Sequence, residues 1–358
     1  MRYRISLDSG MQLYKYRLHQ KIGGGRFGEV WLAHDITLDR EVAVKVQVLS
    51  KSAIGDVLQE AQIGNCLNHG NLVKVHTADL AKLGEERLFL IVMDIYPNGS
   101  ITEKVNEMGF IALHDAIRYL TDILKGLEYL HDNGLYHGDI KPSNILISQR
   151  DEAVLTDYGI SCYAADFVPV RPKMFYIPHV APEIIRNEQI SVQTDIYQVG
   201  MTAFRLLNGE DKIKTIFERK GVEGYRDLVL QGKVIQSGDY LPFIPRSLKR
   251  ILSKAIHVDP SRRYQTALEM RRALEKLNYP GYWTCDSEGN FLGYNGKNTF
   301  SFSSELRKRD RYNFTATKKG KSGRVIRMTR YSKKNASLKE MKNLKQKFML
   351  FVVTGNPN

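Results

Sequence analysis

The sequence predicts an α+β protein in which a sheet-rich part with one helix precedes a mostly helical part and a small basic α+β domain. Two hydrophobic patterns and one shift in charge predict this order. The segment EVAVKVQVL alternates as a strand does, with its valines on one face and Ala43, Lys45 and Gln47 on the other. The segment ALHDAIRYLTDILKGLEYLHDNG instead repeats apolar residues at helical spacing.

Composition excludes several classes of protein. The chain has 358 residues, of which 42% are hydrophobic and 26% charged, an ordinary globular balance. Its cysteines, Cys66, Cys162 and Cys285, are far apart and form no CxxC pair, which argues against a disulfide framework or zinc site and favours a reducing compartment. The start lacks the apolar core of a secretory signal, and the run FMLFVV is too short to span a membrane. We therefore expect a cytoplasmic protein without a membrane span.

The net charge of +14 is concentrated at one end of the chain. From Pro280 onward there are 17 Lys and Arg against 5 Asp and Glu, whereas the preceding residues are nearly neutral. This shift predicts a domain of residues 14–278, with lobes of about 14–95 and 99–278, and a basic accessory domain of residues 279–358.

The remaining elements follow from the same patterns. Residues 87–95 form a continuous apolar run typical of a buried strand, and residues 52–68 can form one helix between the two strands. Further expected helices cover residues 112–134, 194–209, 245–256 and 264–278. The last part reads as strands within 282–302 and 311–331, followed by a helix over 336–352.

A glycine-rich segment, KIGGGRFGEVWLAHD, could hold phosphates. Gly23, Gly25 and Gly28 let the backbone approach a polyphosphate so that its amides donate to phosphate oxygens. An ordinary hairpin turn explains the glycines equally well on this motif alone. A dinucleotide-binding fingerprint would open a helix, but strands follow here, so a nucleotide would lie beneath a hairpin.

Lys45 lies on the strand after this hairpin. It shares a face with Ala43, so a small residue could cover an adenine while the ammonium group reaches the phosphates. Glu60, on the helix that follows, is available to orient the lysine.

The segment LYHGDIKPSN packs a histidine, an aspartate, a lysine and an asparagine around a proline, as either an exposed polar loop or a catalytic site would. It is one of eight motifs that occur in a fixed order. They are Gly23–Val30, VAVK ending at Lys45, Glu60, HGDIKPSN from His137, DYG from Asp157, APE from Ala181, DIYQVG from Asp195 and DPSRR from Asp259. In these motifs the chain resembles the eukaryotic-type (Hanks-type) serine/threonine protein kinases, and its short loops are similar to those of bacterial members. The resemblance covers roughly residues 14–278 and implies the bilobal protein-kinase fold.

The resemblance also implies an activity and a set of site residues. The implied reaction transfers the γ-phosphate of ATP, with Mg²⁺ or Mn²⁺ as a substitute, to serine or threonine hydroxyls of protein substrates, including the chain itself. The implied catalytic residues are Asp139, Lys141, Lys45 and Glu60, and the implied metal ligands are Asn144 and Asp157. The implied nucleotide-binding residues are Ile22, Gly23, Gly24, Gly25, Arg26, Phe27, Gly28, Val30, Ala43, Lys45, Met93, Asp94, Tyr96 and Leu146. Asp195 and the Glu183–Arg263 pair are implied to be architectural.

The sequence departs from the family at three positions. Gly138 replaces the arginine that reads a phosphate on the activation loop, so we expect constitutive activity or control by another contact. Tyr158 replaces a phenylalanine without an expected loss of activity. Tyr176 replaces a threonine that lines the acceptor site, which weakens the assignment of serine/threonine specificity.

Two other classes of function stay open. One is a pseudokinase scaffold that acts through its basic tail, although the complete set of motifs argues against it. The other is a small-molecule phosphotransferase, which the APE segment, Asp195 and Arg263 disfavour.

The basic tail has three interpretations: a nucleic-acid-binding module, a solvated face of a docked domain, or a docking surface for an acidic protein. In the first, Tyr312, Phe314 or Tyr331 would stack on bases. The final helix is expected to present a packing face that includes Leu338, Met341, Leu344, Phe348 and Phe351.

Overall fold

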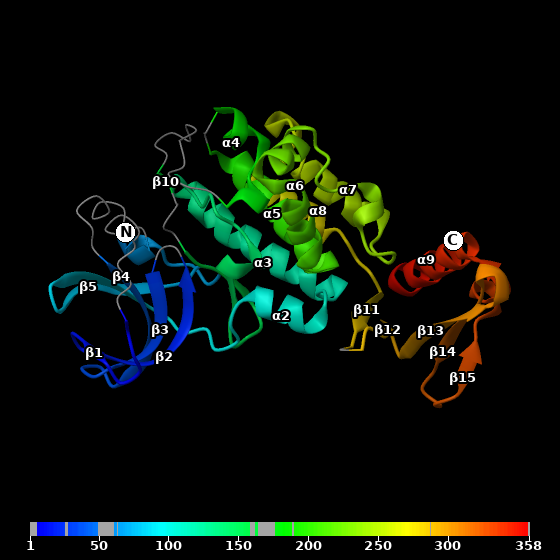
Figure 1. Ribbon diagram of the computed structural model, residues 1–358, viewed down its shortest axis with the longest axis horizontal. Coiled ribbons are helices and arrows are strands. Elements are labelled where there is room, and N and C mark those ends of the chain that lie inside the picture. The colour runs from blue at the N-terminus through cyan, green and yellow to red at the C-terminus, as the bar shows by residue number, and fades with distance from the viewer. Residues whose placement is uncertain are drawn as a thin grey trace.

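The computed structural model describes residues 6–25, 28–48, 61–62, 64–157, 162–163, 176–187, 190–286 and 288–356. Three parts follow one another along the long axis of the molecule (Figure 1). A sheet-rich lobe lies at one end, a helical lobe lies in the middle, and the carboxyl-terminal domain lies at the far end.

The first lobe is a six-stranded antiparallel sheet in the order β1-β2-β3-β4-β6-β5. Its strands are β1 (Gln12–Leu13), β2 (Tyr16–Gly25), β3 (Gly28–Asp35), β4 (Arg40–Val48), β5 (Val75–Leu83) and β6 (Glu86–Met93). The valines of β4 pack into one apolar cluster and Ala43 into another, so the strand is buried on both faces. Lys45 therefore exposes only 6% of its surface, less than an alternating strand with one solvated face would allow. Most of the helix expected over residues 52–68 lies outside the described residues; positions 61, 62 and 64–66 are helical.

The second lobe is built around two long buried helices. Its helices are α2 (Ile101–Met108), α3 (Leu113–Asp132), α4 (Pro182–Asn187), α5 (Val192–Asn208), α6 (Asp211–Leu230), α7 (Arg246–Ala255) and α8 (Ala267–Glu275). The apolar stripe of α3 is buried as predicted, and the helix stops at Asn133 and Gly134, whose φ of 69° suits glycine. Short pieces complete the lobe: β7 (Leu135–Tyr136), η1 (Pro142–Asn144), β8 (Ile145–Ile147), β9 (Ala153–Leu155), β10 (Cys162–Tyr163), η4 (Ile177–His179), η5 (Ser237–Asp239) and η6 (Pro260–Arg262).

The carboxyl-terminal domain is an antiparallel sheet with one helix, α9, packed on one face. Its elements are β11 (Gly281–Cys285), β12 (Phe291–Asn295), β13 (Asn298–Arg307), η7 (Lys308–Asp310), β14 (Arg311–Lys319), β15 (Val325–Arg327), η8 (Thr329–Tyr331), β16 (Lys333–Ser337) and α9 (Leu338–Thr354). In its core, Trp283 and Phe300 of the sheet pack against Phe348 of α9. The ring centroid of Phe348 lies 5.8 Å from that of Trp283 and 6.2 Å from that of Phe300.

This core corrects one hypothesis about the tail. Phe314 and Tyr331 expose 0% and 3% of their surfaces, so neither can stack on a base. Strand alternation explains the burial of Phe314, because it lies on the sheet face that α9 covers. Of the residues expected on the packing face of the last helix, Phe348 is fully buried as predicted, whereas Leu338 is 44% exposed.

An aromatic cluster joins this domain to the helical lobe. The ring of Phe291 lies 5.9 Å from that of Phe110 and 6.4 Å from that of Phe243. The ring of Tyr282 lies 4.5 Å from that of His114 on α3. The domain is therefore docked on the helical lobe rather than only tethered to it (Figure 1).

The described residues contain neither a membrane-spanning helix nor a metal-binding cluster of three or more His, Cys, Asp or Glu side chains. Cys66 and Cys285 are free thiols.

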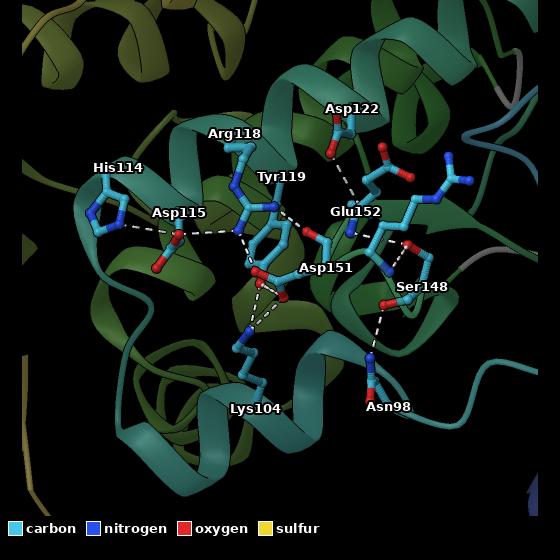
Figure 2. Close-up of polar contacts among 12 residues, drawn as sticks. Asn98, Lys104, His114, Asp115, Arg118, Tyr119, Asp122, Ser148, Asp151 and Glu152 are labelled. Carbon is cyan, nitrogen blue, oxygen red and sulfur yellow. Dashed lines mark hydrogen bonds and ion pairs between the residues drawn. The ribbon is translucent and has the colours of Figure 1, made fainter.

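A polar network centred on Asp151 fixes the turn between β8 and β9 (Figure 2). Its carboxylate accepts from Lys104 of α2 at 2.9 Å, and from Tyr119 and Arg118 of α3, each at 2.5 Å. Burial alone would raise the pKa of Asp151, but these donors outweigh it and lower the pKa to about 2. The network matters for function because β8 and β9 lead into the candidate active site.

We predict that Asp151 makes the protein sensitive to acid. Its folded pKa lies below the ordinary value of about 3.9, so its stabilising effect is complete above that pH and is lost as pH falls from about 4 towards 2. Urea unfolding of Asp151→Asn should therefore show lower stability than the native chain at pH 7, with a difference that shrinks towards pH 2. The exposed Asp227, changed to Asn, is the control. An equal pH dependence for both variants would contradict the prediction.

Candidate active site

The segment Gly138–Ile140 is buried between β7 and η1 and belongs to no helix or strand. Its backbone groups therefore need side-chain partners. The side chains of Asp195 and Gln198, both on α5, bond three of these six backbone groups. Asp195 Oδ1 accepts from the amide of Gly138 at 2.8 Å, and the carboxamide of Gln198 accepts from Ile140 N and donates to Gly138 O, both at 2.8 Å.

The other three backbone groups are bonded as well. The amide of Asp139 donates to His137 Nδ1 at 3.3 Å, and Asn144 Nδ2 donates to the carbonyl of Asp139 at 3.0 Å. His179 Nδ1 contacts the carbonyl of Ile140 at 2.8 Å. Side chains thus bond every backbone amide and carbonyl of the segment, which fixes where Asp139 points.

The Asp139 carboxylate is almost fully buried, with 2% of the residue exposed. Its Oδ2 accepts from Lys141 Nζ at 2.5 Å and from Asn144 Nδ2 at 3.0 Å. Its Oδ1 has no hydrogen-bond partner within the described part of the chain. Burial raises the pKa of Asp139, and Lys141 opposes that shift. One oxygen is held in place while the other is left to accept a proton or hydrogen bond.

A second carboxylate, Asp157, follows β9. It accepts from Lys45 Nζ of β4 at 2.9 Å, and this ion pair links the two lobes. Burial acts to raise the pKa of Asp157, but the charge and hydrogen bond of Lys45, and then the charge of Lys141, outweigh it, so the pKa lies below its usual value. Asp157 therefore stays a carboxylate.

The backbone of Asn144 is bonded next to Asp157, because the carbonyl of Asn144 accepts from the amide of Thr156, the residue before Asp157, at 3.0 Å. Its Nδ2 donates to Asp139, and its amide oxygen accepts only a long contact from Ser143 Oγ at 3.4 Å. The carboxylate of Asp157 and the amide oxygen of Asn144 are hard oxygen donors, and Mg²⁺ commonly takes only one or two such protein ligands beside phosphate oxygens. The donor set fits a small divalent cation.

The apolar residues expected around an adenine come together between the lobes. Ala43 and Met93 are register partners on β4 and β6 and belong to one buried cluster. Val30, Tyr96 and Leu146 pack against that cluster. The amide of Asp94 donates to Lys74 O at 3.2 Å, so its carbonyl is the backbone group that a ligand can use.

The glycine-rich hairpin is described on both sides of its tip. Gly28 has a φ of 127°, and a Cβ there would lie 2.3 Å from Val46 O. Only glycine fits, because β3 starts directly against β4. Ile22, on β2 before the tip of the hairpin, is 48% exposed. Of the other expected site residues, Arg26, Phe27 and Glu60 lie outside the described residues, as does Tyr158.

Sequence reasoning missed Gln198 and His179. Gln198 is a buried amide within the apolar stretch of α5, and that polar interruption was the available signal. Burial, and then Arg205, hold the pKa of His179 well below its usual value. The neutral ring donates from Nδ1 to Ile140 O and accepts from Arg205 Nη1 at 2.8 Å.

Tyr176 occupies the acceptor region beside these groups. The Lys141 ammonium lies 4.9 Å from the centre of its ring, a cation–π contact. The ring is 37% exposed and lies 5.6 Å from that of His179. Tyr176 therefore touches Lys141 through its ring face.

The expected architectural residues are also paired. Arg263 donates to both carboxylate oxygens of Glu183, at 2.8 and 2.7 Å. Asp195, fully buried, further accepts from the amide of His137 and contacts His131 Nε2, both at 2.9 Å.

The comparison with known proteins agrees with this geometry. The model of the protein kinase domain family matches residues 16–275. Serine/threonine-protein kinase PrkC of Bacillus subtilis is 29% identical over 262 residues, which cover 72% of this chain and 39% of PrkC. Serine/threonine-protein kinase PknB of Mycobacterium leprae is 30% identical over 271 residues, covering 74% of this chain and 43% of PknB. The chain thus spans less than half the length of these relatives. With the family match covering most of its length, the chain belongs to the protein kinase domain family.

Proposed function

We propose that this protein is a serine/threonine protein kinase that transfers the γ-phosphate of ATP to protein substrates, itself included. The observation that carries the proposal is the Asp139 carboxylate, with Oδ2 bonded to Lys141 and Asn144 and Oδ1 buried without a partner among the described residues. The names of PrkC and PknB support the serine/threonine assignment.

The proposed mechanism assigns a role to each group. Asp139 Oδ1 accepts the hydrogen bond of the substrate hydroxyl, orients it and takes its proton as the phosphate is transferred. Lys141 neutralises charge that develops on the transferring phosphate, and Lys45 binds the α- and β-phosphates. In this state Lys45 contacts Asp157, and Glu60 is proposed as its second carboxylate partner. The residues orient and neutralise, which is most of what phosphoryl transfer requires.

Asn144 and Asp157 are proposed to hold the divalent cation, which would neutralise negative charge on the phosphates. Two oxygen ligands suit Mg²⁺, with Mn²⁺ as a substitute. The adenine would lie among Val30, Ala43 and Leu146, with Met93 behind it. The backbones of Asp94 and Tyr96 would bond its edge, and the glycine-rich hairpin, residues 22–28, would cover the phosphates.

We propose that activity does not depend on a phosphate read by residue 138. Gly138 has no side chain to read one, and its φ of 76° suits glycine. Gln198 and His179 instead anchor the segment from inside the lobe. The catalytic loop is therefore set by contacts of the folded lobe.

The division of the chain at residue 278 and a cytoplasmic location remain predictions. We propose that the docked domain of residues 279–358 recruits an anionic partner, a nucleic acid or an acidic protein. Under the pseudokinase alternative, the protein would recruit this partner without transferring phosphate.

Asp139→Asn should abolish phosphate transfer from [γ-³²P]ATP with Mg²⁺. Loss of a positioned base costs roughly 10²- to 10⁴-fold in rate. The matched control is Asp132→Asn, an exposed carboxylate at the end of α3. Phosphoamino-acid analysis of the labelled protein then tests the serine/threonine assignment. Equal labelling by Asp139→Asn and the native chain would exclude this mechanism, whereas no labelling by the native chain would favour the scaffold.

Gln198→Leu should lower kcat about 10- to 100-fold with little change in the KM for ATP. Leucine fills the space but leaves Ile140 N and Gly138 O unbonded, so Asp139 shifts relative to the acceptor hydroxyl.

Gln198→Glu keeps an acceptor for Ile140 N and, with its buried carboxyl group protonated, a donor for Gly138 O, so it should be less impaired than Gln198→Leu. Thr202→Val, on the next turn of α5 with only a 3.4 Å contact to Ile140 O, is the control. A folded Gln198→Leu enzyme with native kcat would refute this positioning role.

A further inference from the structure

The sheet of the carboxyl-terminal domain has a second face, opposite α9. Strand register defines it, because residues paired across antiparallel strands point to the same side. This face, called the open face below, consists of Tyr282, Thr284, Leu292, Tyr294, Thr299, Ser301, Ser303, Glu305, Arg307, Arg311, Asn313, Thr315, Thr317, Lys319, Val325, Arg327 and Ser337. All these residues are exposed or half-exposed, whereas the α9 face holds the buried aromatic core. α9 packs above the sheet in Figure 1, and the open face lies on the other side.

The middle of the open face is a stripe of hydroxyl groups. Ser301 lies opposite Thr317, with their hydroxyls 2.8 Å apart, and Ser303 lies opposite Thr315. Short hydroxyl side chains leave the strands flat and offer both donors and acceptors. An extended polar ligand can therefore approach the backbone closely here.

Positive charge lies at both ends of this stripe. At one end Arg307 and Arg311 are direct register partners, an arrangement of like charges that costs stability unless an anion lies between them. Arg307 also pairs with Glu305 at 2.9 Å, and Glu305 is the sole carboxylate of the open face. Excess positive charge therefore remains.

At the other end Lys319 lies next to a second cationic pair. Lys321 follows two residues later in the next turn, and the nearby Lys297 lowers the pKa of Lys321. Arg327 of β15, opposite Thr317, adds a further guanidinium. Since β13 has ten residues, the two cationic ends lie on the order of 30 Å apart.

An aromatic pair continues the open face towards the helical lobe. Tyr282 and Tyr294 are register partners with ring centroids 5.0 Å apart and planes at 20°. Tyr294 lies directly beside Thr299 of the hydroxyl stripe. Its half-exposed ring is available as a stacking surface, which the buried Phe314 and Tyr331 are not.

We propose that the open face binds single-stranded nucleic acid, with phosphates at its two cationic ends and a base stacked on Tyr294. This inference rests on the proposal that the domain recruits an anionic partner, and it is independent of the kinase activity.

Three features favour a nucleic acid over an acidic protein. Cations at two separated ends suit a ligand whose charge repeats along its length. Three of the four cations on the open face, Arg307, Arg311 and Arg327, carry guanidinium groups, whose fork matches phosphate oxygens. An aromatic ring beside a flat polar surface is typical of sites that stack unpaired bases.

The test is fluorescence anisotropy of the full chain, without ATP, with a labelled single-stranded oligonucleotide of about 12 nucleotides, as DNA and as RNA. The native chain should bind. Arg311→Gln combined with Lys319→Gln should weaken binding at least about tenfold and reduce the slope of log K against log salt by about 1.4. Tyr294→Leu should weaken binding about fivefold or more without changing that slope.

The matched control removes the same charge elsewhere. Lys342 and Lys347 occupy exposed positions of α9, away from the open face. The double variant Lys342→Gln with Lys347→Gln should leave the affinity for the oligonucleotide nearly unchanged. Equal weakening by both pairs, or no binding by the native chain, would overturn the proposal. Polyglutamate bound as tightly as the oligonucleotide would replace it with an acidic protein partner. Phosphate transfer by both charge variants should stay native, so a failure here leaves the kinase proposal separately testable.

Discussion

The buried, irregular backbone of Gly138–Ile140 imposes the constraint on which the rest of the catalytic lobe depends. A buried amide or carbonyl without a partner costs about 1–3 kcal/mol, and this segment has no helix or strand to bond its groups. Asp195 and Gln198 of α5 form hydrogen bonds with these backbone groups, and so does His179 from the segment before α4. The position of the candidate base is thus a consequence of helix packing.

The same dependence extends outward from the site. α5 can hold the loop only because it is buried against α3, and α3 also anchors the β8–β9 turn through the Asp151 network. Asp157 follows β9, which packs on α3, so the same packed helices support both candidate carboxylates. The accessory domain contacts the helical lobe through Phe291, at the end of the molecule away from the sheet-rich lobe (Figure 1). A partner bound at the proposed open face would therefore lie far from the proposed nucleotide site.

Much of the fold was predictable because local periodicity survives folding. The helices expected over residues 112–134, 194–209 and 336–352 correspond to α3, α5 and α9. α6 was not predicted: a non-helical residue, Gly221, interrupts it, and it lacks a continuous apolar stripe. Among the expected site residues, Lys45 contacts Asp157 and Asp139 contacts Lys141, whereas Glu60, the expected partner of Lys45, lies outside the described residues. Base stacking by Phe314 and Tyr331 was wrong, because charge in the sequence does not say which sheet face a helix covers.

By itself, the sequence determined the family and the order of most elements, and it predicted the residue types of the candidate active site, because motif spacing and hydrophobic period are local properties. Tertiary structure decided which other residues hold the candidate site residues in place. Gln198 lies 60 residues from Gly138, and Arg263 lies 80 residues from Glu183. Such pairs follow from how helices pack around a buried loop that must bond its backbone, and spacing along the chain carries no record of that requirement.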